Sequence, residues 1–214
     1  MEKFKNKNLR ASSKNWISRQ SNDPYARLAK KEGYRSRSAF KLIEINKKFN
    51  FLKNNLNIID LGSAPGGWSQ VISNINKHGK NLSVDILQME KINNISFFKK
   101  DFNDNNFLKF VNDFFNASKV DLVLSDMAVN TTGNRDLDAF KTNSLALEAV
   151  NLSKNVLKNE SYLLLKFFTG KDDEVLIKSV KDLFEKITRI KPDSSRKDSR
   201  EMYLLCKNLK TIWL

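Results

Sequence analysis

The order of short apolar runs and amphipathic stretches constrains the fold of this chain more than any other feature. Strand-like apolar runs occupy residues 56–62, 82–87, 95–98, 120–126 and 162–168. Four of these runs are followed by stretches with apolar residues at helical spacing, at 67–75, 105–115, 144–157 and 172–184. The alternation predicts an α/β fold in which helices cover both faces of a mainly parallel sheet.

Two further strands, near residues 186–190 and 201–206, end the pattern without a helix between them. A connection without a helix favours a hairpin, so we expect one antiparallel strand in a seven-stranded sheet. A chain of 214 residues, 40% of them hydrophobic, can build one domain with a substantial core. We therefore assign residues 36–214, which begin with an expected helix at 36–49, to a single domain.

Positive charge is concentrated at the start of the chain. Residues 1–48 carry 14 Lys/Arg and 4 Asp/Glu, whereas the rest of the chain carries 24 and 20, within a total formal charge of +14. Concentrated basic charge attracts phosphates without reading sequence, so we interpret residues 1–35 as a basic arm that binds RNA. A solvated basic tail and the beginning of an organelle transit peptide are the alternatives.

Membrane and metal-binding features are not expected. No apolar run reaches the roughly 18 residues that a membrane span needs, and the N-terminus lacks the apolar core of a secretory signal. We expect a cytoplasmic protein that does not bind membranes. Cys206 is the only cysteine and lies in an apolar run, and His78 is the only histidine and lies in a loop-like stretch, so we expect no disulfide and no metal site.

A glycine-containing turn separates the first strand from the first helix and reads DLGSAPGGW, residues 60–68. Gly62, Gly66 and Gly67 would let the backbone turn sharply and approach a ligand closely. Ligands of open parallel sheets lie beyond the carboxyl ends of the strands, where this turn belongs. The spacing differs from the G-x-G-x-x-G fingerprint of dinucleotide-binding proteins, which counts against a dehydrogenase, and a tight turn without a ligand is the alternative.

Three acidic residues stand at the ends of three successive strands: Asp60, Asp85 and Asp101. Asp85 occupies the position where such folds place a carboxylate on ribose hydroxyls, and Asp101 could accept a hydrogen bond from an exocyclic amine. No phosphate cradle accompanies them. The set fits a nucleoside with a cationic tail better than a nucleotide, and S-adenosylmethionine is such a ligand.

The fifth strand contains a lysine, Lys166, in the otherwise apolar run SYLLLKFF. A buried ammonium without a partner is costly, so Lys166 should have acidic partners or lie at the solvent-facing end of its strand. The fourth strand ends at Asp126, and the two side chains converge if the strands are neighbours. A strand-end lysine whose amine reaches solvent is the alternative.

Five segments resemble, in the same order, the motifs of the FtsJ/RrmJ family of 23S ribosomal RNA 2′-O-ribose methyltransferases. They read GYRSRSAFKL, DLGSAPGGWSQ, LSDMAVN, LLLKFF and KPDSSRKDSREMYLL, and they cover most of residues 25–207. The resemblance implies a Rossmann-like class I methyltransferase fold with an antiparallel final strand and S-adenosylmethionine as the methyl donor. It also implies ribosomal RNA of the large subunit as the substrate, with a uridine ribose as the expected acceptor. We expect a monomer.

The resemblance also assigns the site. Carried over motif by motif, the family's catalytic tetrad falls on Lys41, Asp126, Lys166 and Glu201. The predicted cofactor contacts are Asp60, Gly62, Gly66, Trp68, Asp85, Asp101 and Asp126. Lys166 is the expected proton acceptor, with Asp126 and Glu201 orienting it and Lys41 adding positive charge near the developing oxyanion.

Some loops depart from the family pattern. Val129 replaces a proline after Asp126, LQME stands where many relatives have Pro-Met-Asp, and KNES replaces a glycine turn before the fifth strand. These changes affect loop rigidity and not the tetrad, so they would lower the rate before they abolished activity. Arginines expected to flank the mouth of the site are predicted to contact RNA phosphates: Arg35, Arg37, Arg196 and Arg200.

Other functions fit the sequence less well. A base N-methyltransferase should show an Asn/Asp-Pro-Pro-aromatic loop after the fourth strand, and SDMAVN has none. A cytosine C5 enzyme needs a nucleophilic cysteine, whereas Cys206 should be buried. A transfer-RNA ribose methyltransferase and a non-catalytic RNA-binding ribosome-assembly factor remain the alternatives.

Overall fold

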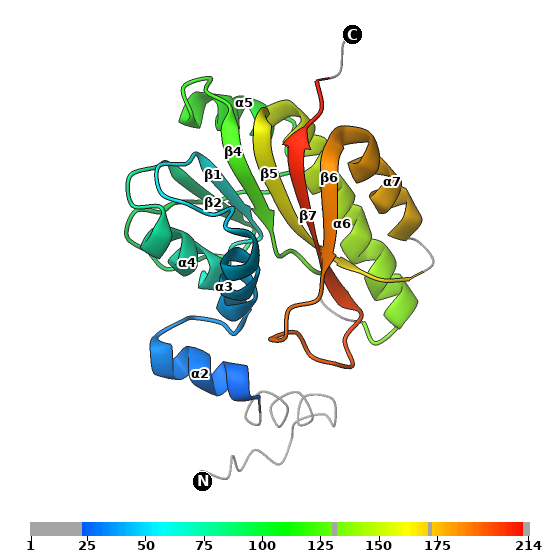
Figure 1. The fold of residues 1–214 in the computed structure, drawn as a ribbon. Helices are drawn as coiled ribbons and strands as arrows, with labels where there is room; N and C mark the ends of the chain where they lie inside the picture. The colour runs from blue at the N-terminus through cyan, green and yellow to red at the C-terminus, as the bar shows by residue number, and fades with distance from the viewer. Residues whose placement is uncertain (1–22, 130–131, 171–172, 212–214) are drawn as a thin grey trace.

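The sheet of this protein has seven strands in the order β3-β2-β1-β4-β5-β7-β6 in a computed structural model that describes residues 23–129, 132–170 and 173–211 (Figure 1). The strands are β1 (Ile58–Leu61), β2 (Asn81–Asp85), β3 (Ser96–Lys99), β4 (Val120–Ser125), β5 (Leu157–Phe168), β6 (Phe184–Ile190) and β7 (Glu201–Leu209). The five strands from β3 to β5 are parallel, and β7 is antiparallel to both of its neighbours. The predicted mainly parallel sheet with one antiparallel strand is confirmed.

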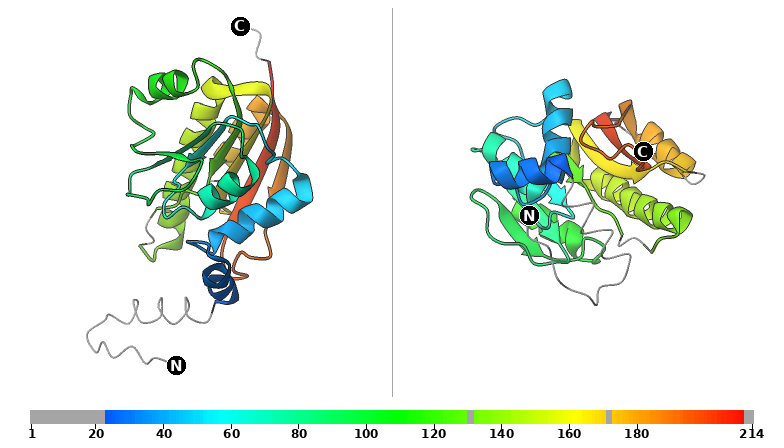
Figure 2. Two further views of the ribbon diagram at one scale, coloured as in Figure 1. Left: turned by 90° about the vertical axis from the view of Figure 1, so that its left-hand side faces the viewer. Right: turned by 90° about the horizontal axis from the view of Figure 1, so that it is seen from below.

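Helices cover both faces of the sheet. Those described are α2 (Pro24–Glu32), α3 (Ser38–Phe49), α4 (Gly67–Ile75), α5 (Phe107–Phe114), α6 (Arg135–Val156) and α7 (Asp173–Leu183). Two hydrophobic clusters, one between the sheet and α3 and α4, the other between the sheet and α5, α6 and α7, form the core. The view from below in Figure 2 shows α3 and α6 on opposite sides of the strands. No helix in the described ranges is long and apolar enough to cross a bilayer.

Alternation along the strands decides which side chains reach which face. On β5, Leu163, Leu165 and Phe167 pack in the cluster under α5, α6 and α7, whereas Leu164 packs in the cluster under α3 and α4. Lys166 is two residues beyond Leu164 and therefore lies on the α3 face. The lysine that interrupts an apolar strand thus points to the helix that carries Lys41.

Helix α6 and strand β5 both begin earlier than the sequence pattern predicts. Helix α6 starts at Arg135 rather than at residue 144, because the side chain of Asn134 caps it by accepting hydrogen bonds from the main-chain N–H groups of residues 136 and 137. Its first turns expose Leu137 and Phe140, so they lack an amphipathic pattern. Strand β5 starts at Leu157 rather than at residue 162, directly after the helix.

Helix α2 was not predicted. Asp23 caps it by accepting hydrogen bonds from the main-chain N–H groups of Tyr25 and Ala26, Pro24 stands at its first position, and Gly33 ends it in the left-handed conformation. The ring of Tyr25 packs against Phe40 of α3, with 5.7 Å between the ring centroids. The described part of the predicted basic arm therefore packs on the domain, and residues 1–22 of that arm lie outside the described residues.

Candidate active site

The four residues of the predicted tetrad meet at the edge of the sheet where β4 and β5 end and β7 begins. Lys41 comes from α3, Asp126 follows β4, Lys166 lies near the end of β5 and Glu201 starts β7. The antiparallel register places Tyr203 opposite Lys166, and Glu201 opposite Phe168. Elements from both ends of the chain are therefore needed to assemble the cluster.

Lys166 and Asp126 form the first ion pair of the tetrad. The Lys166 amine donates to the main-chain oxygen of Asp126 at 2.6 Å and lies 3.2 Å from its carboxylate oxygen Oδ1. The two side chains are only 8% and 15% exposed. The partner that a lysine in this strand requires is therefore the aspartate at the end of the neighbouring strand, as expected from the sequence.

Lys41 and Glu201 form the second ion pair. The Lys41 amine lies 2.7 Å from Oε1 and 2.8 Å from Oε2 of Glu201, and the side chains are 10% and 12% exposed. The hydroxyl of Ser195 donates to Oε1 of Glu201 at 2.8 Å. Glu201 therefore contacts Lys41, and the acid that directly contacts Lys166 is Asp126.

Tyr203 joins the two pairs, and sequence reasoning missed it. Its hydroxyl donates to Oδ1 of Asp126 at 2.7 Å, and its ring lies 5.7 Å from the Lys41 amine and 5.9 Å from the Trp68 ring. The side chain is fully buried. Only the register between β5 and β7 could have revealed it, because Tyr203 appears in the sequence as one more apolar residue of the final strand.

The field at the tetrad keeps Asp126 ionised. Burial raises the pKa of Asp126. The charges of Lys166 and Lys41 and the hydroxyl of Tyr203 lower it by more than burial raises it, so the pKa lies below its usual value. The pKa of Tyr203 is raised well above its usual value by burial and by the charges of Asp126 and Glu201. Tyr203 is therefore a neutral hydrogen-bond donor, and Asp126 a carboxylate that accepts from two sides.

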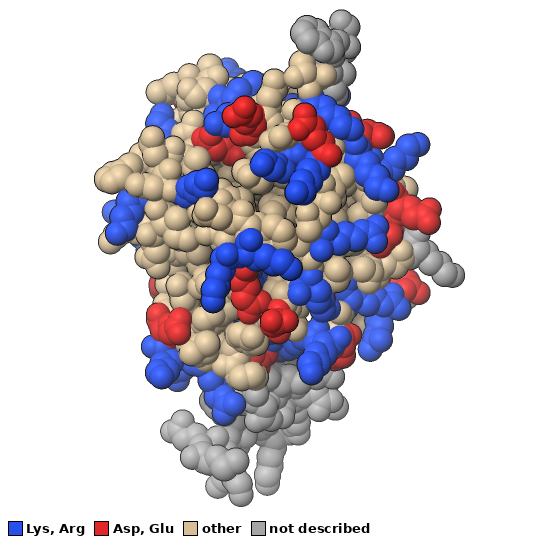
Figure 3. Space-filling model, in the orientation of Figure 1, with Lys and Arg blue, Asp and Glu red and all other residues tan. Residues whose placement is uncertain are grey.

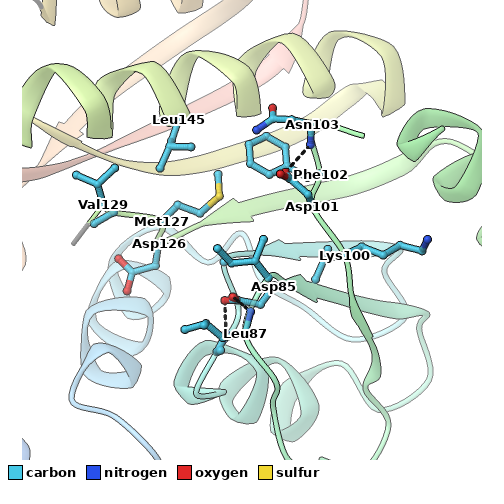
Figure 4. A pocket seen from close by; sticks show the side chains of 15 residues that line it. Asp85, Leu87, Lys100, Asp101, Phe102, Asn103, Asp126, Met127, Val129 and Leu145 are labelled. Carbon is cyan, nitrogen blue, oxygen red and sulfur yellow. Dashed lines mark hydrogen bonds between the residues drawn. The ribbon is translucent and has the colours of Figure 1, made fainter. Parts of the chain in front are cut away.

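A cavity of about 560 Å³ opens beside the tetrad, beyond the carboxyl ends of β1, β2, β3 and β4 (Figure 4). Acidic side chains reach it from three directions, namely Asp85, Asp101 and Asp126, and the remaining wall is mostly apolar. Ile86 and Leu87 are 62% and 63% exposed on one side, and Val129 and Leu145 lie on another side. Asp126 thus belongs to the cavity and to the tetrad.

The carboxylate of Asp85 also organises the wall that it belongs to. Its oxygens accept hydrogen bonds from the main-chain N–H groups of Ala64 and Leu87, each at 2.8 Å. The carboxylate of Asp101 accepts from the main-chain N–H of Asn103 at 2.9 Å. Both acids therefore have preset directions, with lone pairs left for a ligand.

The predicted cofactor residues divide into two sets. Gly62, Asp85, Asp101 and Asp126 line the cavity. Gly62 has a φ of +70°, and a Cβ there would lie 2.3 Å from Cγ of Met127, so the position requires glycine.

The other three predicted cofactor residues are not among those that line this cavity: Asp60, Gly66 and Trp68. Asp60 is buried, and one of its carboxylate oxygens accepts from the hydroxyl of Ser69 on α4 at 2.6 Å. Trp68 donates to the main-chain oxygen of Ser38 at 2.8 Å. The hydrogen bonds of Asp60 and Trp68 are therefore made to other residues of the protein.

The arginines predicted to bind phosphates differ in what they contact. Arg37 and Arg196 both contact the carboxylate of Asp23, the residue that caps α2, and Arg200 contacts Asp136 at 2.7 Å. Arg35 instead donates to main-chain oxygens of Pro65, Glu90 and Lys91. Basic side chains are spread over the face shown in Figure 3, with fewer acidic ones among them. RNA binding by these arginines stays a prediction.

Cys206 is the only cysteine of the chain and is fully buried on β7, as predicted. Burial raises the pKa of its thiol. A thiol that is neutral and shielded from solvent cannot act as a nucleophile toward a nucleobase.

Comparisons with known proteins agree with this geometry. Residues 34–209 match the FtsJ-like methyltransferase family. The chain is 46% identical over 198 residues to the ribosomal RNA large subunit methyltransferase E of Pelagibacter ubique, covering 92% of this chain and 97% of that protein. It is 41% identical to the protein of the same name from Pseudomonas fluorescens, covering 91% and 93%. A solved structure described as a ribosomal RNA methyltransferase from Plasmodium falciparum superposes with a TM-score of 0.73 at 31% identity, covering 82% of this chain and 98% of that one.

Proposed function

Because the chain belongs to the FtsJ-like methyltransferase family, we propose that it transfers a methyl group from S-adenosylmethionine to a ribose 2′-hydroxyl in 23S ribosomal RNA, with a uridine as the expected acceptor. The relatives that support the substrate are named for methylation of large-subunit ribosomal RNA. The observation that carries the proposal is the position of Asp126, whose carboxylate lines the cavity and also contacts Lys166. Asp126 therefore belongs to the proposed donor pocket and also contacts the proposed proton acceptor, Lys166.

The cavity fits S-adenosylmethionine in size and chemistry. Its volume of about 560 Å³ lies within the range of cavities that hold small molecules. We expect Asp85 to accept hydrogen bonds from the ribose hydroxyls and Asp101 to accept from the adenine amine. The apolar side chains of Ile86 and Leu87 would contact the base, and the carboxylate of Asp126 suits the cationic end of the molecule.

The bound donor supplies an electrophilic methyl group for an in-line displacement. The protein must aim the 2′-hydroxyl and remove its proton, since a neutral hydroxyl is a poor nucleophile. We assign this proton to the amine of Lys166, which can accept a proton only as a neutral amine. Asp126 fixes the direction of the amine, and the positive charge of Lys41 would stabilise the developing oxyanion.

Arg37, Arg196 and Arg200 are the proposed phosphate contacts, together with the basic arm at residues 1–35. The side chains of Arg196 and Arg200 are 37% and 42% exposed, and the loop that carries them leads directly to Glu201. Contacts of this kind fix the position of the RNA without reading its sequence. Charge reversal at these arginines should weaken RNA binding and reduce its dependence on salt.

The test is transfer of radiolabelled methyl groups from S-adenosylmethionine to large ribosomal subunits from a methylation-deficient strain. Transfer RNA and the Lys166→Ala variant serve as parallel reactions. Label in the large-subunit RNA that disappears in the variant is the expected result. Label only in transfer RNA would show that transfer RNA, and not ribosomal RNA, is the substrate. No label in any RNA despite tight RNA binding would make a ribosome-assembly factor the better assignment.

A further inference from the structure

Arg35 holds together two loops on the outside of the donor cavity. Its Nη1 donates to the main-chain oxygens of Pro65 at 3.2 Å and Glu90 at 2.8 Å, and its Nη2 donates to that of Lys91 at 3.0 Å. The side chain is 21% exposed. The carboxylate of Glu90 lies 3.7 Å from Nη2, but it is 91% exposed, so this ion pair adds little to the three hydrogen bonds.

The two loops follow the neighbouring strands β1 and β2 and both contribute to the wall of the same cavity. Pro65 belongs to the turn after β1, whose residues Gly62 and Ala64 line the cavity. Residues 90 and 91 belong to the loop after β2, which begins with the lining residues Ile86 and Leu87. Asp85 joins the same two loops from the inside through the N–H groups of Ala64 and Leu87. The two loops are therefore joined twice, by Asp85 on the cavity side and by Arg35 on the outer side.

The main chain around Arg35 is fixed to the same wall. The N–H of Arg35 donates to the side-chain oxygen of Gln70 at 2.8 Å, and the Gln70 amide donates to the main-chain oxygen of Gly33 at 2.9 Å. The chain then enters α3, where Ser38 accepts from Trp68 and where Lys41 joins the tetrad. The segment thus connects the wall of the cavity to a catalytic helix.

The contacts require an arginine. A guanidinium presents its N–H groups in a fixed plane, so it can donate to three carbonyls that lie in different loops, whereas a lysine amine is a compact point charge on a flexible chain. Both N–H groups of Nη1 are already used by Pro65 and Glu90. Three of the five N–H groups are thus used within the protein, which leaves two for any other acceptor.

We propose that Arg35 is a positioning residue of the donor cavity, holding the loop after β2 against the turn after β1 so that the wall is preformed before the donor binds. The proposal rests on the proposed function for the identity of the donor. It gives Arg35 a role different from the phosphate contact that its place in a basic segment suggests. Preforming a wall increases affinity because the loop need not be ordered on binding.

The first measurement is hydrogen–deuterium exchange of the ligand-free protein, which needs no donor and no RNA. In the Arg35→Met variant, amides in residues 62–70 and 86–92 should exchange faster, and peptides from β4, β5 and β7 should be unchanged. Arg35→Lys should fall between Arg35→Met and the unaltered protein. Arg27→Met, at an exposed position on α2, removes one positive charge from the same segment and should leave the exchange of both loops unchanged.

The second measurement is equilibrium binding. Arg35→Met should bind S-adenosylmethionine about tenfold more weakly, while the salt dependence of RNA binding stays the same. Unchanged exchange and unchanged donor affinity would overturn the proposal, and a salt slope reduced by about one would then identify a phosphate contact. If Arg35→Met exchanges faster throughout the sheet, the whole domain is destabilised, and Arg35→Lys is used in its place. Faster exchange of its residues 62–70 and 86–92 alone would support the proposal, and unchanged exchange of these residues would overturn it. An unaltered protein that binds no donor would refute the proposed function, and the exchange of residues 86–92 would still test the role of Arg35.

Discussion

The tetrad and the donor cavity share Asp126 but handle charge in opposite ways. In the tetrad, two lysines face two carboxylates, every pair is within 3.2 Å and the side chains are at most 15% exposed. In the cavity, Asp85 and Asp101 accept hydrogen bonds from main-chain N–H groups, and within the described ranges neither makes an ion pair. The first region pairs its charges internally, whereas the carboxylates of the second contact main-chain N–H groups and, in our proposal, the cationic donor.

The largest effect is expected at Lys166, which belongs to the tetrad alone. If Lys166 is the proton acceptor, as we propose, Lys166→Ala should lower kcat by about 10²- to 10⁴-fold. The affinity for S-adenosylmethionine should change little, since Lys166 does not line the cavity. Single-turnover methyl transfer and equilibrium dialysis measure the two quantities.

Lys166→Arg is the matched control, because it keeps the charge beside Asp126 but cannot accept a proton at ordinary pH. It should be as inactive as Lys166→Ala. Near-normal rates in both variants would remove Lys166 from the role of base. A donor affinity that falls together with kcat would show that the two regions are not separable.

The next effect is expected at Asp85, which belongs to the cavity alone. Asp85→Asn keeps the size of the side chain, removes the charge that would accept from the ribose hydroxyls, and replaces one of the two oxygens that accept from Ala64 and Leu87 by an NH2 group. The KM for S-adenosylmethionine should increase by about 10- to 100-fold, because a hydrogen bond to a charged group is weakened. At saturating donor, kcat should be preserved. A reduced kcat with an unchanged KM would contradict the division between the regions.

A smaller effect is expected at Tyr203, which connects the two ion pairs. Tyr203→Phe keeps the buried ring and removes the hydrogen bond to Asp126. Asp126 still has Lys166, so we expect a decrease in kcat of about tenfold, corresponding to about 1.4 kcal/mol. Steady-state rates over a range of donor concentrations provide the measurement. A rate equal to that of the unaltered protein would mean that Lys166 alone orients Asp126.

The smallest effect on the rate is expected at Asp60, whose contribution is to stability and depends on pH. Burial raises the pKa of Asp60 from 3.8 to about 7, although the hydroxyl of Ser69 lowers it, and the charges of Asp126 and Asp85 raise it further. Between about pH 4 and 7 the folded protein therefore keeps a proton that the unfolded chain has lost. The stability that this proton provides at low pH is lost as the pH rises through this window.

Urea unfolding of the unaltered protein and of Asp60→Asn between pH 5 and 8 tests this prediction. The unaltered protein should lose free energy of unfolding relative to the variant as the pH rises to about 7, by at most about 1.4 kcal/mol per pH unit. Above that pH the difference should be constant. A difference that is constant from pH 5 onwards would show that Asp60 is ionised throughout.

The sequence predicted the parts of the site in which a charged residue interrupts or ends an apolar strand. Lys166 interrupts an apolar strand, and Asp126 ends the neighbouring one, so their pairing follows from the order of β4 and β5. Tyr203 could not be found in this way. Its contact with Asp126 depends on the register between β5 and β7, two strands that are not consecutive in the chain, and the local pattern does not give that register.

Contacts to main-chain atoms were also invisible in the sequence. Arg35 binds three carbonyl oxygens, and carbonyl oxygens are present at every residue, so nothing in the sequence identifies its partners. The early start of α6 was missed for a related reason. Its first turns are held by the Asn134 cap, while Leu137 and Phe140 are 40% and 55% exposed and give no apolar stripe.

The position of β7 between β5 and β6 also determines when the site can exist during synthesis. Strand β6 leaves the ribosome before β7, but it contacts the sheet only through β7, so it has to wait for its neighbour. Glu201 is translated 160 residues after its partner Lys41, a delay on the order of 10 s. Only in the last part of that interval, after Lys166 has been added, does the nascent chain carry both lysines, and it then still lacks Glu201 and Tyr203. The tetrad is therefore incomplete on a nascent chain until β7 has left the ribosome.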